Sequence, residues 1–141
     1  MRCRALLAVS LAALAAGCAT DVGPSQAELK AKWEAQNIVP QSYKQDLIAY
    51  MHTYLNEPAG IRDAAVSGPV LKDFGPGQRF VACVRFNARN SEGKYDDDPK
   101  EGVAVFVSGK LDRFFDTPRD ARDYCKDAAY VPFPELATLK R

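Results

Sequence analysis

Side chains that could carry catalytic or metal chemistry are few in this chain of 141 residues. It has one histidine, His52, and four cysteines, at positions 3, 18, 83 and 125. No pair of cysteines has the Cys-x-x-Cys or Cys/His spacing that holds zinc. His52 has no serine or cysteine nucleophile near it in the sequence, and the chain carries no phosphate-binding loop or dinucleotide fingerprint. We therefore expect no metal site, no cofactor and no catalytic residue that the sequence can name.

Carboxylates gather in one predicted loop, where Asp96–Asp98 are consecutive and Glu92 and Glu101 lie nearby. Several carboxylates together could hold Ca²⁺, which prefers oxygen ligands. The alternating ligands of an EF-hand are missing, however, and Pro99 follows directly. The sequence favours an acidic loop in solvent, and a Ca²⁺ site at Asp96–Asp98 stays as an alternative.

A second polar group comprises Asn87, Arg89, Asn90 and Tyr95, beside Gly93. Asparagine side chains bond nearby backbone groups and tolerate left-handed backbone, as the end of a strand requires. Loops on rigid scaffolds also carry binding residues, so the same four side chains form a candidate recognition cluster. The sequence favours the structural role and leaves the binding role open.

Three helices are predicted around these residues. The segment 43–55 has the clearest helical period, with an apolar stripe of Tyr43, Leu47, Tyr50 and Tyr54. A capping box begins a polar helix over 25–36, for which Trp33 is the one large anchor. Pro118 at the first helical position predicts a short helix over 117–124.

The rest of the chain is predicted to form strands. Residues 79–87 alternate between two faces, one of which carries Phe80, Ala82, Val84 and Phe86. Residues 103–107 and 111–115 form a hairpin around the turn at 108–110. The segment 62–71 is weaker because Gly68-Pro69 interrupts it. The tail at 130–134 is predicted to be extended and to lie against the body of the domain.

This order of elements predicts an α+β fold. We expect an antiparallel sheet of three to four strands, with one long amphipathic helix packed on a face. The predicted divisions are a signal peptide at 1–17, a tether with a short polar helix at 18–40, and a single domain at 41–141.

The first residues have the features of an export signal. Arg2 and Arg4 precede an unbroken run of small apolar residues, 5–16, which is too short to cross a bilayer. The run ends in Leu14-Ala15-Ala16-Gly17-Cys18, which resembles the lipobox of bacterial lipoproteins, where the cysteine is acylated. Ordinary cleavage after the Ala-x-Ala sequence that ends at Ala15 is the alternative.

Lipidation at Cys18 would leave a nearly neutral exported chain. Removal of Arg2 and Arg4 leaves 17 basic against 18 acidic residues, so membrane affinity must come from the acyl chains. The same balance argues against a nucleic-acid partner. By resemblance to the sorting rule of Gram-negative lipoproteins, the absence of Asp after Cys18 implies the outer membrane, facing the periplasm.

Two cysteines remain in the exported chain once Cys3 leaves with the signal and Cys18 carries lipid. Because disulfides persist in exported proteins, we predict a bond between Cys83 and Cys125.

The stretch from Cys83 to Tyr95 has the pattern Cys-x-x-x-Asn-Ala-Arg-Asn-x-x-Gly-x-Tyr, and a Leu-x-Glu-Pro exit precedes it at 55–58. With these features the segment 43–106 resembles a small exported module of uncharacterised bacterial lipoproteins. It departs from that module at Glu57, where Asp is usual, and at Lys94, where a second Gly is common. The resemblance implies the fold and the compartment and brings no activity with it.

Two classes of function follow. The first is a non-catalytic envelope lipoprotein, held at the membrane by acyl chains, that binds a protein, peptidoglycan or lipid partner. The second is a periplasm-facing enzyme with a site built from carboxylates far apart in the sequence. The sequence favours the first, because catalytic sites gather perturbed groups in a pocket and no such grouping is visible in the chain.

Overall fold

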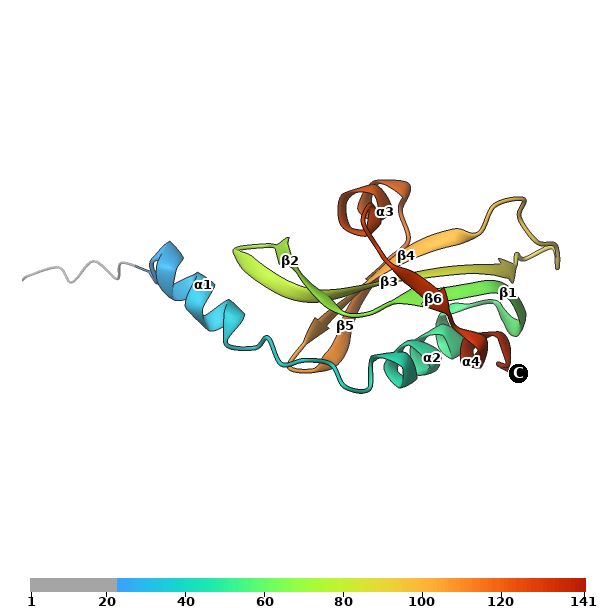
Figure 1. The fold of residues 1–141 in the computed structure, drawn as a ribbon, viewed down its shortest axis with the longest axis horizontal. Coiled ribbons are helices and arrows are strands. Elements are labelled where there is room, and N and C mark those ends of the chain that lie inside the picture. The colour runs from blue at the N-terminus through green and yellow to red at the C-terminus, as the bar shows by residue number, and fades with distance from the viewer. Residues whose placement is uncertain (1–22) are drawn as a thin grey trace, which may run out of the picture.

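The computed structural model describes residues 23–141, so the predicted signal peptide and Cys18 lie outside the described part. One antiparallel sheet has the strand order β5-β4-β3-β1-β6, and β2 pairs separately with β3. Helices α2 and α4 lie below this sheet in Figure 1, and α3 lies above it. The elements are α1 (Gln26–Glu34), α2 (Tyr43–Tyr54), β1 (Glu57–Ser67), β2 (Val70–Phe74), β3 (Gly77–Arg89), β4 (Lys100–Val107), β5 (Lys110–Phe115), α3 (Pro118–Cys125), β6 (Tyr130–Pro132) and α4 (Pro134–Ala137).

The predicted α+β class is confirmed, but the prediction of three to four strands and one long helix is wrong in detail. The described residues form six strands and four short helices. Gly68-Pro69 divides the weak segment into two strands, β1 and β2, which pair with different halves of β3. The tail adds β6 to the outer edge of β1, with Val131 opposite Val66. Three residues show no usable period, so this pairing leaves no signal in the sequence.

The face of the sheet under α2 and α4 carries the larger core. Its buried side chains come from the alternating positions predicted for 79–87, from β4, and from both helices. Leu47 and Met51 of α2 and Leu136 of α4 are fully buried. A hydrophobic cluster of this kind stabilises the fold through the apolar area that it removes from water.

The opposite face carries a smaller cluster under α3, made of Val81, Cys83, Val103, Val105 and Cys125. Thr117 caps α3 by accepting a hydrogen bond from the Asp120 amide, and Pro118 takes the first turn, as predicted. Only Ala121 and Cys125 of this eight-residue helix are buried. Tyr124 of the same helix is partly buried, and the centre of its ring lies 5.7 Å from that of Phe74, so α3 packs on the sheet through a small set of side chains.

Helix α1 is attached through one buried arginine on β3. Arg79 is 2% exposed, and its guanidinium lies 3.8 Å from the ring of Trp33. Arg79 also donates hydrogen bonds to the Trp33 carbonyl and, at 2.9 Å, to Gln36 Oε1. Burial lowers the pKa of Arg79 from its usual value. Trp33, the one large anchor predicted for this helix, thus packs on the end of the sheet where β2 turns into β3.

Candidate functional site

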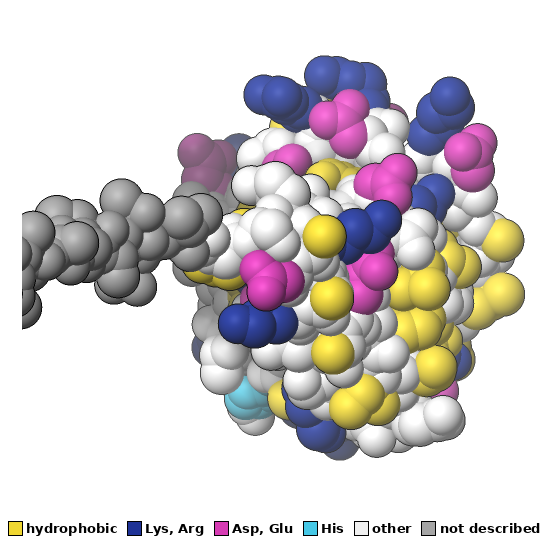
Figure 2. All heavy atoms as spheres, turned by 90° about the vertical axis from the view of Figure 1, so that its left-hand side faces the viewer, with side chains coloured by type: hydrophobic (Ala, Val, Ile, Leu, Met, Phe, Trp, Pro, Cys, Tyr) yellow, Lys and Arg dark blue, Asp and Glu magenta, His cyan; other side chains and the backbone are white. Residues whose placement is uncertain are grey.

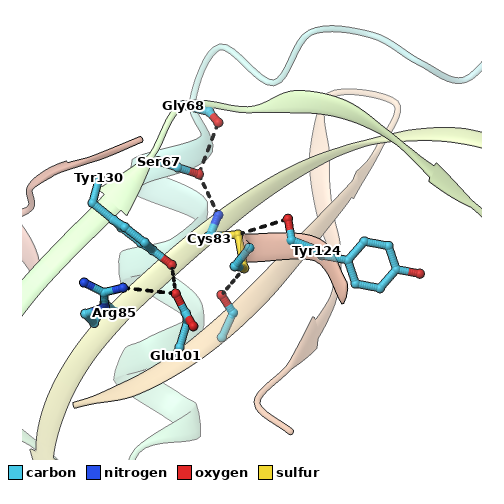
Figure 3. Close-up of a disulfide and its surroundings, with 9 residues drawn as sticks. Ser67, Gly68, Cys83, Arg85, Glu101, Tyr124 and Tyr130 are labelled. Atoms are coloured by element: carbon cyan, nitrogen blue, oxygen red, sulfur yellow. Dashed lines mark hydrogen bonds and ion pairs between the residues drawn. A yellow bond between two sulfur atoms is a disulfide. The ribbon is translucent and has the colours of Figure 1, made fainter. Parts of the chain in front are cut away.

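The disulfide predicted between Cys83 and Cys125 is confirmed, and it joins the middle of β3 to the last residue of α3. The two Cα atoms are 5.8 Å apart, within the ordinary range for such a bond. The Cys83 amide donates to Ser67 Oγ at 2.8 Å, which connects the bond to β1 as well (Figure 3). The disulfide supplies the attachment that the small apolar face of α3 lacks.

Next to the disulfide, Arg85, Glu101 and Tyr130 form a polar cluster from three strands (Figure 3). Arg85 and Glu101 are opposite each other on β3 and β4, and their side chains form an ion pair at 3.3 Å. Tyr130 donates its hydroxyl proton to Glu101, and the Arg85 guanidinium lies 4.2 Å from the centre of its ring. Burial, followed by the hydrogen bond to Glu101, raises the pKa of Tyr130 far above its usual value. Tyr130 therefore stays protonated at neutral pH and serves as a donor rather than a base.

A groove of about 780 Å³ runs between this cluster and α3. Its lining combines apolar and small residues with charged ones, namely Arg85, Pro99, Lys100, Glu101, Asp116, Pro118, Ala121, Arg122, Cys125 and Lys126. Its volume lies in the range of small-molecule binding sites. Because Cys125 is part of the lining, the disulfide fixes one wall of the groove.

The loop after β3 places the predicted polar residues in structural roles. Asn87 is 7% exposed and donates from Nδ2 to the Asp96 carbonyl at 2.7 Å. Asn90 Oδ1 accepts from the amides of Glu92 and Lys94, both at 3.0 Å. These bonds close the turn in which Gly93 has a φ of +76°.

Tyr95 folds back from the same loop onto β1. Its hydroxyl donates to the Gly60 carbonyl at 2.5 Å, and the guanidinium of Arg62 lies 3.8 Å from the centre of its ring. Arg89 lies 5.5 Å from the same ring. The structure thus brings Arg89 and Tyr95 together with Arg62, whereas Asn87 and Asn90 act on the loop backbone. Arg62 was not among the residues singled out from the sequence.

The remaining sequence candidates lie apart from the groove. His52 is exposed on α2, and Asp96–Asp98 are exposed in the loop. Within residues 23–141, no group of three or more His, Cys, Asp or Glu side chains is placed to hold a metal ion. The alternative Ca²⁺ site at Asp96–Asp98 therefore finds no support. No helix in the same residues is long and apolar enough to cross a membrane.

Comparison with known proteins finds no relative whose function could be transferred to this chain. No family model, curated protein or solved structure matches the chain. The account of the groove consequently rests on its own residues.

Sequence reasoning missed the groove because its lining comes from three separate segments of the chain. The signal that could have found part of it is the pairing of β3 with β4. Once Cys83 is opposite Val103, Arg85 must be opposite Glu101. The fifteen residues between the predicted strands, 88–102, hide this register. The predicted bond between Cys83 and Cys125 indicates the sheet face that α3 covers, but not the residues opposite it.

Proposed function

We propose that this chain is an exported cell-envelope lipoprotein, anchored by acyl chains on Cys18, whose domain binds a partner without chemically changing it. The observation that carries the proposal is the disulfide between Cys83 and Cys125, because such bonds persist in oxidising compartments outside the cytosol. The lipobox-like sequence ending at Cys18 supplies the anchor. The outer membrane, facing the periplasm, is the proposed location.

The groove beside α3 supports a binding role for the domain. Glu101, its most enclosed carboxylate, is already engaged by Arg85 and by the proton of Tyr130. A carboxylate held between two donors shapes and rigidifies a surface more readily than it accepts a proton from a substrate. The partner can be an envelope protein, peptidoglycan or lipid.

The anchor is tested by the substitution Cys18→Ser, with Cys3→Ser as a matched control in the same signal region. Stable membrane attachment needs two acyl chains, so loss of the acylated residue should abolish detergent partitioning of the mature protein. Cys3→Ser should mature and partition like the wild type. Partitioning of Cys18→Ser with the membrane fraction would contradict the proposal.

An enzyme with a carboxylate site is the second candidate, and one observation favours it: Glu101 lies beside Arg85 at the wall of the groove. If Glu101 is catalytic, Glu101→Gln should abolish turnover of cell-wall fragments while retaining the wild-type melting temperature. Products are detected by mass spectrometry after incubation. No turnover by the wild-type protein would remove this candidate for that substrate.

A further inference from the structure

Strand β2 has one edge that no other strand covers within residues 23–141. It pairs with β3 from Val70 to Phe74 and has no second neighbour in the sheet. On the outer side, β6 runs beside β1 only as far as the pair of Ser67 with Tyr130, and it stops before β2 begins. None of the backbone hydrogen bonds made by the described turns, loops and caps involves residues 70–74. The outward N–H and C=O groups of β2 are therefore available for pairing.

The first half of this edge is apolar and exposed. Val70 and Leu71 are 49% and 45% exposed, and as neighbours in a strand they lie on opposite faces of the sheet. β2 reaches the end of the domain that carries α1, and Figure 2, which looks at that end, shows hydrophobic side chains gathered on one side of it. Charged side chains often protect edge strands, but Lys72 and Asp73 have opposite signs. β2 thus has no net charge that would repel a second strand.

A pocket of about 290 Å³ lies beside the same edge, on the face of the sheet that α3 covers. Val70 is opposite Val81 in the register, so its side chain shares the face that carries the disulfide. The lining combines residues of β2 with the floor of the sheet and the end of α3, namely Ser67, Gly68, Val70, Lys72, Val81, Cys83, Tyr124, Asp127, Ala128 and Ala129. Because alternate residues of β2 take part, side chains at alternate positions of an added strand would lie next to this pocket.

The unpaired backbone selects an extended polypeptide as the occupant of this edge. Its N–H and C=O groups repeat at the spacing of a strand, and another strand offers the matching row of donors and acceptors. Lipids and glycans offer no such row. A second copy of the chain fits less well, because the symmetric pairing that overlaps all of β2 places its middle residue, Lys72, opposite Lys72 of the other copy. Like charges directly opposite each other destabilise a sheet, so the occupant is a segment of a different chain.

We infer that β2 is an interaction edge that binds an extended, partly apolar segment of another protein by strand addition, in line with β6. Main-chain hydrogen bonds hold the segment, and its apolar side chains contact Leu71 on one face and the pocket beside Val70 on the other. The lining of this pocket shares no residue with the lining of the groove beside α3. Strand addition also needs no acyl anchor, so this inference can fail or hold independently of the proposed function.

The test uses the purified full chain in neutral detergent and a fluorescent probe peptide, Lys-Thr-Val-Thr-Val-Thr-Lys, capped at both ends. A second peptide has the same side chains but N-methylated inner amides, so it cannot donate hydrogen bonds to an edge strand. Fluorescence anisotropy measures the binding of each. We expect the methylated peptide to bind at least about tenfold more weakly than the first, because its main-chain bonds are lost. Equal binding of the two peptides would overturn the inference, as would no binding of either up to about 1 mM.

A double variant, Val70→Lys with Leu71→Lys, places like charges on the edge. Its matched control is Ile38→Lys with Val39→Lys, a neighbouring pair that is 58% and 53% exposed and lies outside β2. We expect the edge variant to bind the probe about tenfold more weakly than the wild type, since apolar cross-strand pairs contribute up to about fivefold each. The control should bind like the wild type, and equal losses in the two variants would contradict the inference.

Hydrogen exchange of the wild-type protein separates strand addition from adhesion of side chains. Every second N–H of an antiparallel strand points to the same neighbour, so alternate amides within 70–74 should gain protection when the probe binds. Binding of the probe without this alternation would overturn the inference. Sedimentation equilibrium supplies the remaining outcome: a dimer that the edge variant abolishes and the control retains would assign the edge to a second copy of the chain instead.

Discussion

On the face of the sheet that α2 and α4 cover, the described residues bury eleven apolar side chains in one cluster. On the face under α3 they bury five, and two of these are the bonded cysteines. Helix α2 contributes Leu47 and Met51 to its cluster, whereas α3 contributes only Ala121 and Cys125 to burial. One face is thus held by packed area alone, and the other by a smaller packed area together with a covalent bond.

The difference between the two faces explains where a binding site can lie. Close packing of apolar side chains restricts the room for a ligand on the α2 face, where the pocket beside Tyr54 and Phe86 has about 350 Å³. The groove of about 780 Å³ lies along α3, between the segment that enters the helix at Asp116 and Pro118 and the disulfide at its C-terminal end. The disulfide replaces packing on the α3 face and leaves a polar groove there, so the two faces should respond differently to substitution and to reduction.

The largest effect should come from removing the disulfide. Cys83→Ala with Cys125→Ala opens a loop with a sequence separation of 42 residues. The unfolded chain gains entropy, and the free energy of unfolding should fall by about 4 kcal/mol. Urea denaturation measures this change, and reduced wild-type protein should behave like the double variant. A loss below about 1 kcal/mol would contradict the contribution expected from closing this loop.

The next largest effect should come from truncating a buried side chain of the α2 face. This effect should be the same whether the disulfide is oxidised or reduced. Leu47 is fully buried, so Leu47→Ala should lower the free energy of unfolding by about 3 kcal/mol. Leu29→Ala, at an exposed position on α1, should change it by less than about 0.5 kcal/mol. The loss from Leu47→Ala should be the same in oxidised and reduced protein, because distant sites add. A difference greater than about 1 kcal/mol would show that the two faces are coupled.

A smaller effect is expected from the loop that follows β3. Asn87→Ala removes the donor to the Asp96 carbonyl and should cost about 1–3 kcal/mol. Asn56→Ala, at an exposed position, is the control and should change little. An unchanged melting temperature together with lost capture of a partner from the envelope would instead favour the recognition role of Asn87, Arg89, Asn90 and Tyr95.

The smallest effect on stability is expected at alkaline pH, and it involves one tyrosine near each face of the sheet. Burial and hydrogen bonds to carboxylates raise the pKa values of Tyr130, which bonds Glu101, and of Tyr54, which bonds Asp116. Each folded tyrosine keeps its proton at a pH where the unfolded chain, with a tyrosine pKa of about 10, has lost it. Stability is therefore full below about pH 10 and falls as the pH rises further.

Tyr130→Phe and Tyr54→Phe should each make the alkaline loss of stability less steep, as measured by melting temperature between about pH 8 and 11. Tyr130→Phe removes the hydrogen bond to Glu101 at the groove, whereas Tyr54→Phe removes the hydrogen bond to Asp116 near the end of α2. The same alkaline slope in both variants and the wild type would contradict the account of these hydrogen bonds.

The sequence was sufficient where the signal is local. The alternation in 79–87 correctly predicts which side chains of β3 face α2, because a strand has a period of two. The turn at Ser108-Gly109 predicts the β4–β5 hairpin, and Thr117-Pro118 predicts the start of α3. The disulfide is predicted from the two cysteines that would remain if Cys3 left with a signal peptide and Cys18 carried lipid, and the structure contains that bond.

What the sequence could not give depends on contacts between distant segments. The pairing of β6 with β1 joins residues about 65 positions apart through three residues without a period. The partner of Asn87 is the Asp96 carbonyl, nine residues further on, where a nearer backbone group was expected. The lining of the groove comes from β3, from the start of β4 and from the segment between Asp116 and Lys126, and only the tertiary fold brings these segments together.

Hydrogen exchange of the native protein, before and after reduction, tests most directly whether the two faces are held by different means. The account predicts that the amides of α3 lose their protection on reduction and exchange nearly as in an unfolded chain. The amides of β3 and of Leu47 to Met51 should remain protected, lowered only by the common loss of global stability of about 4 kcal/mol. If reduction lowers the protection of α3 and α2 by the same amount, the disulfide acts through the unfolded chain alone, and the α3 face is as firmly packed as the other.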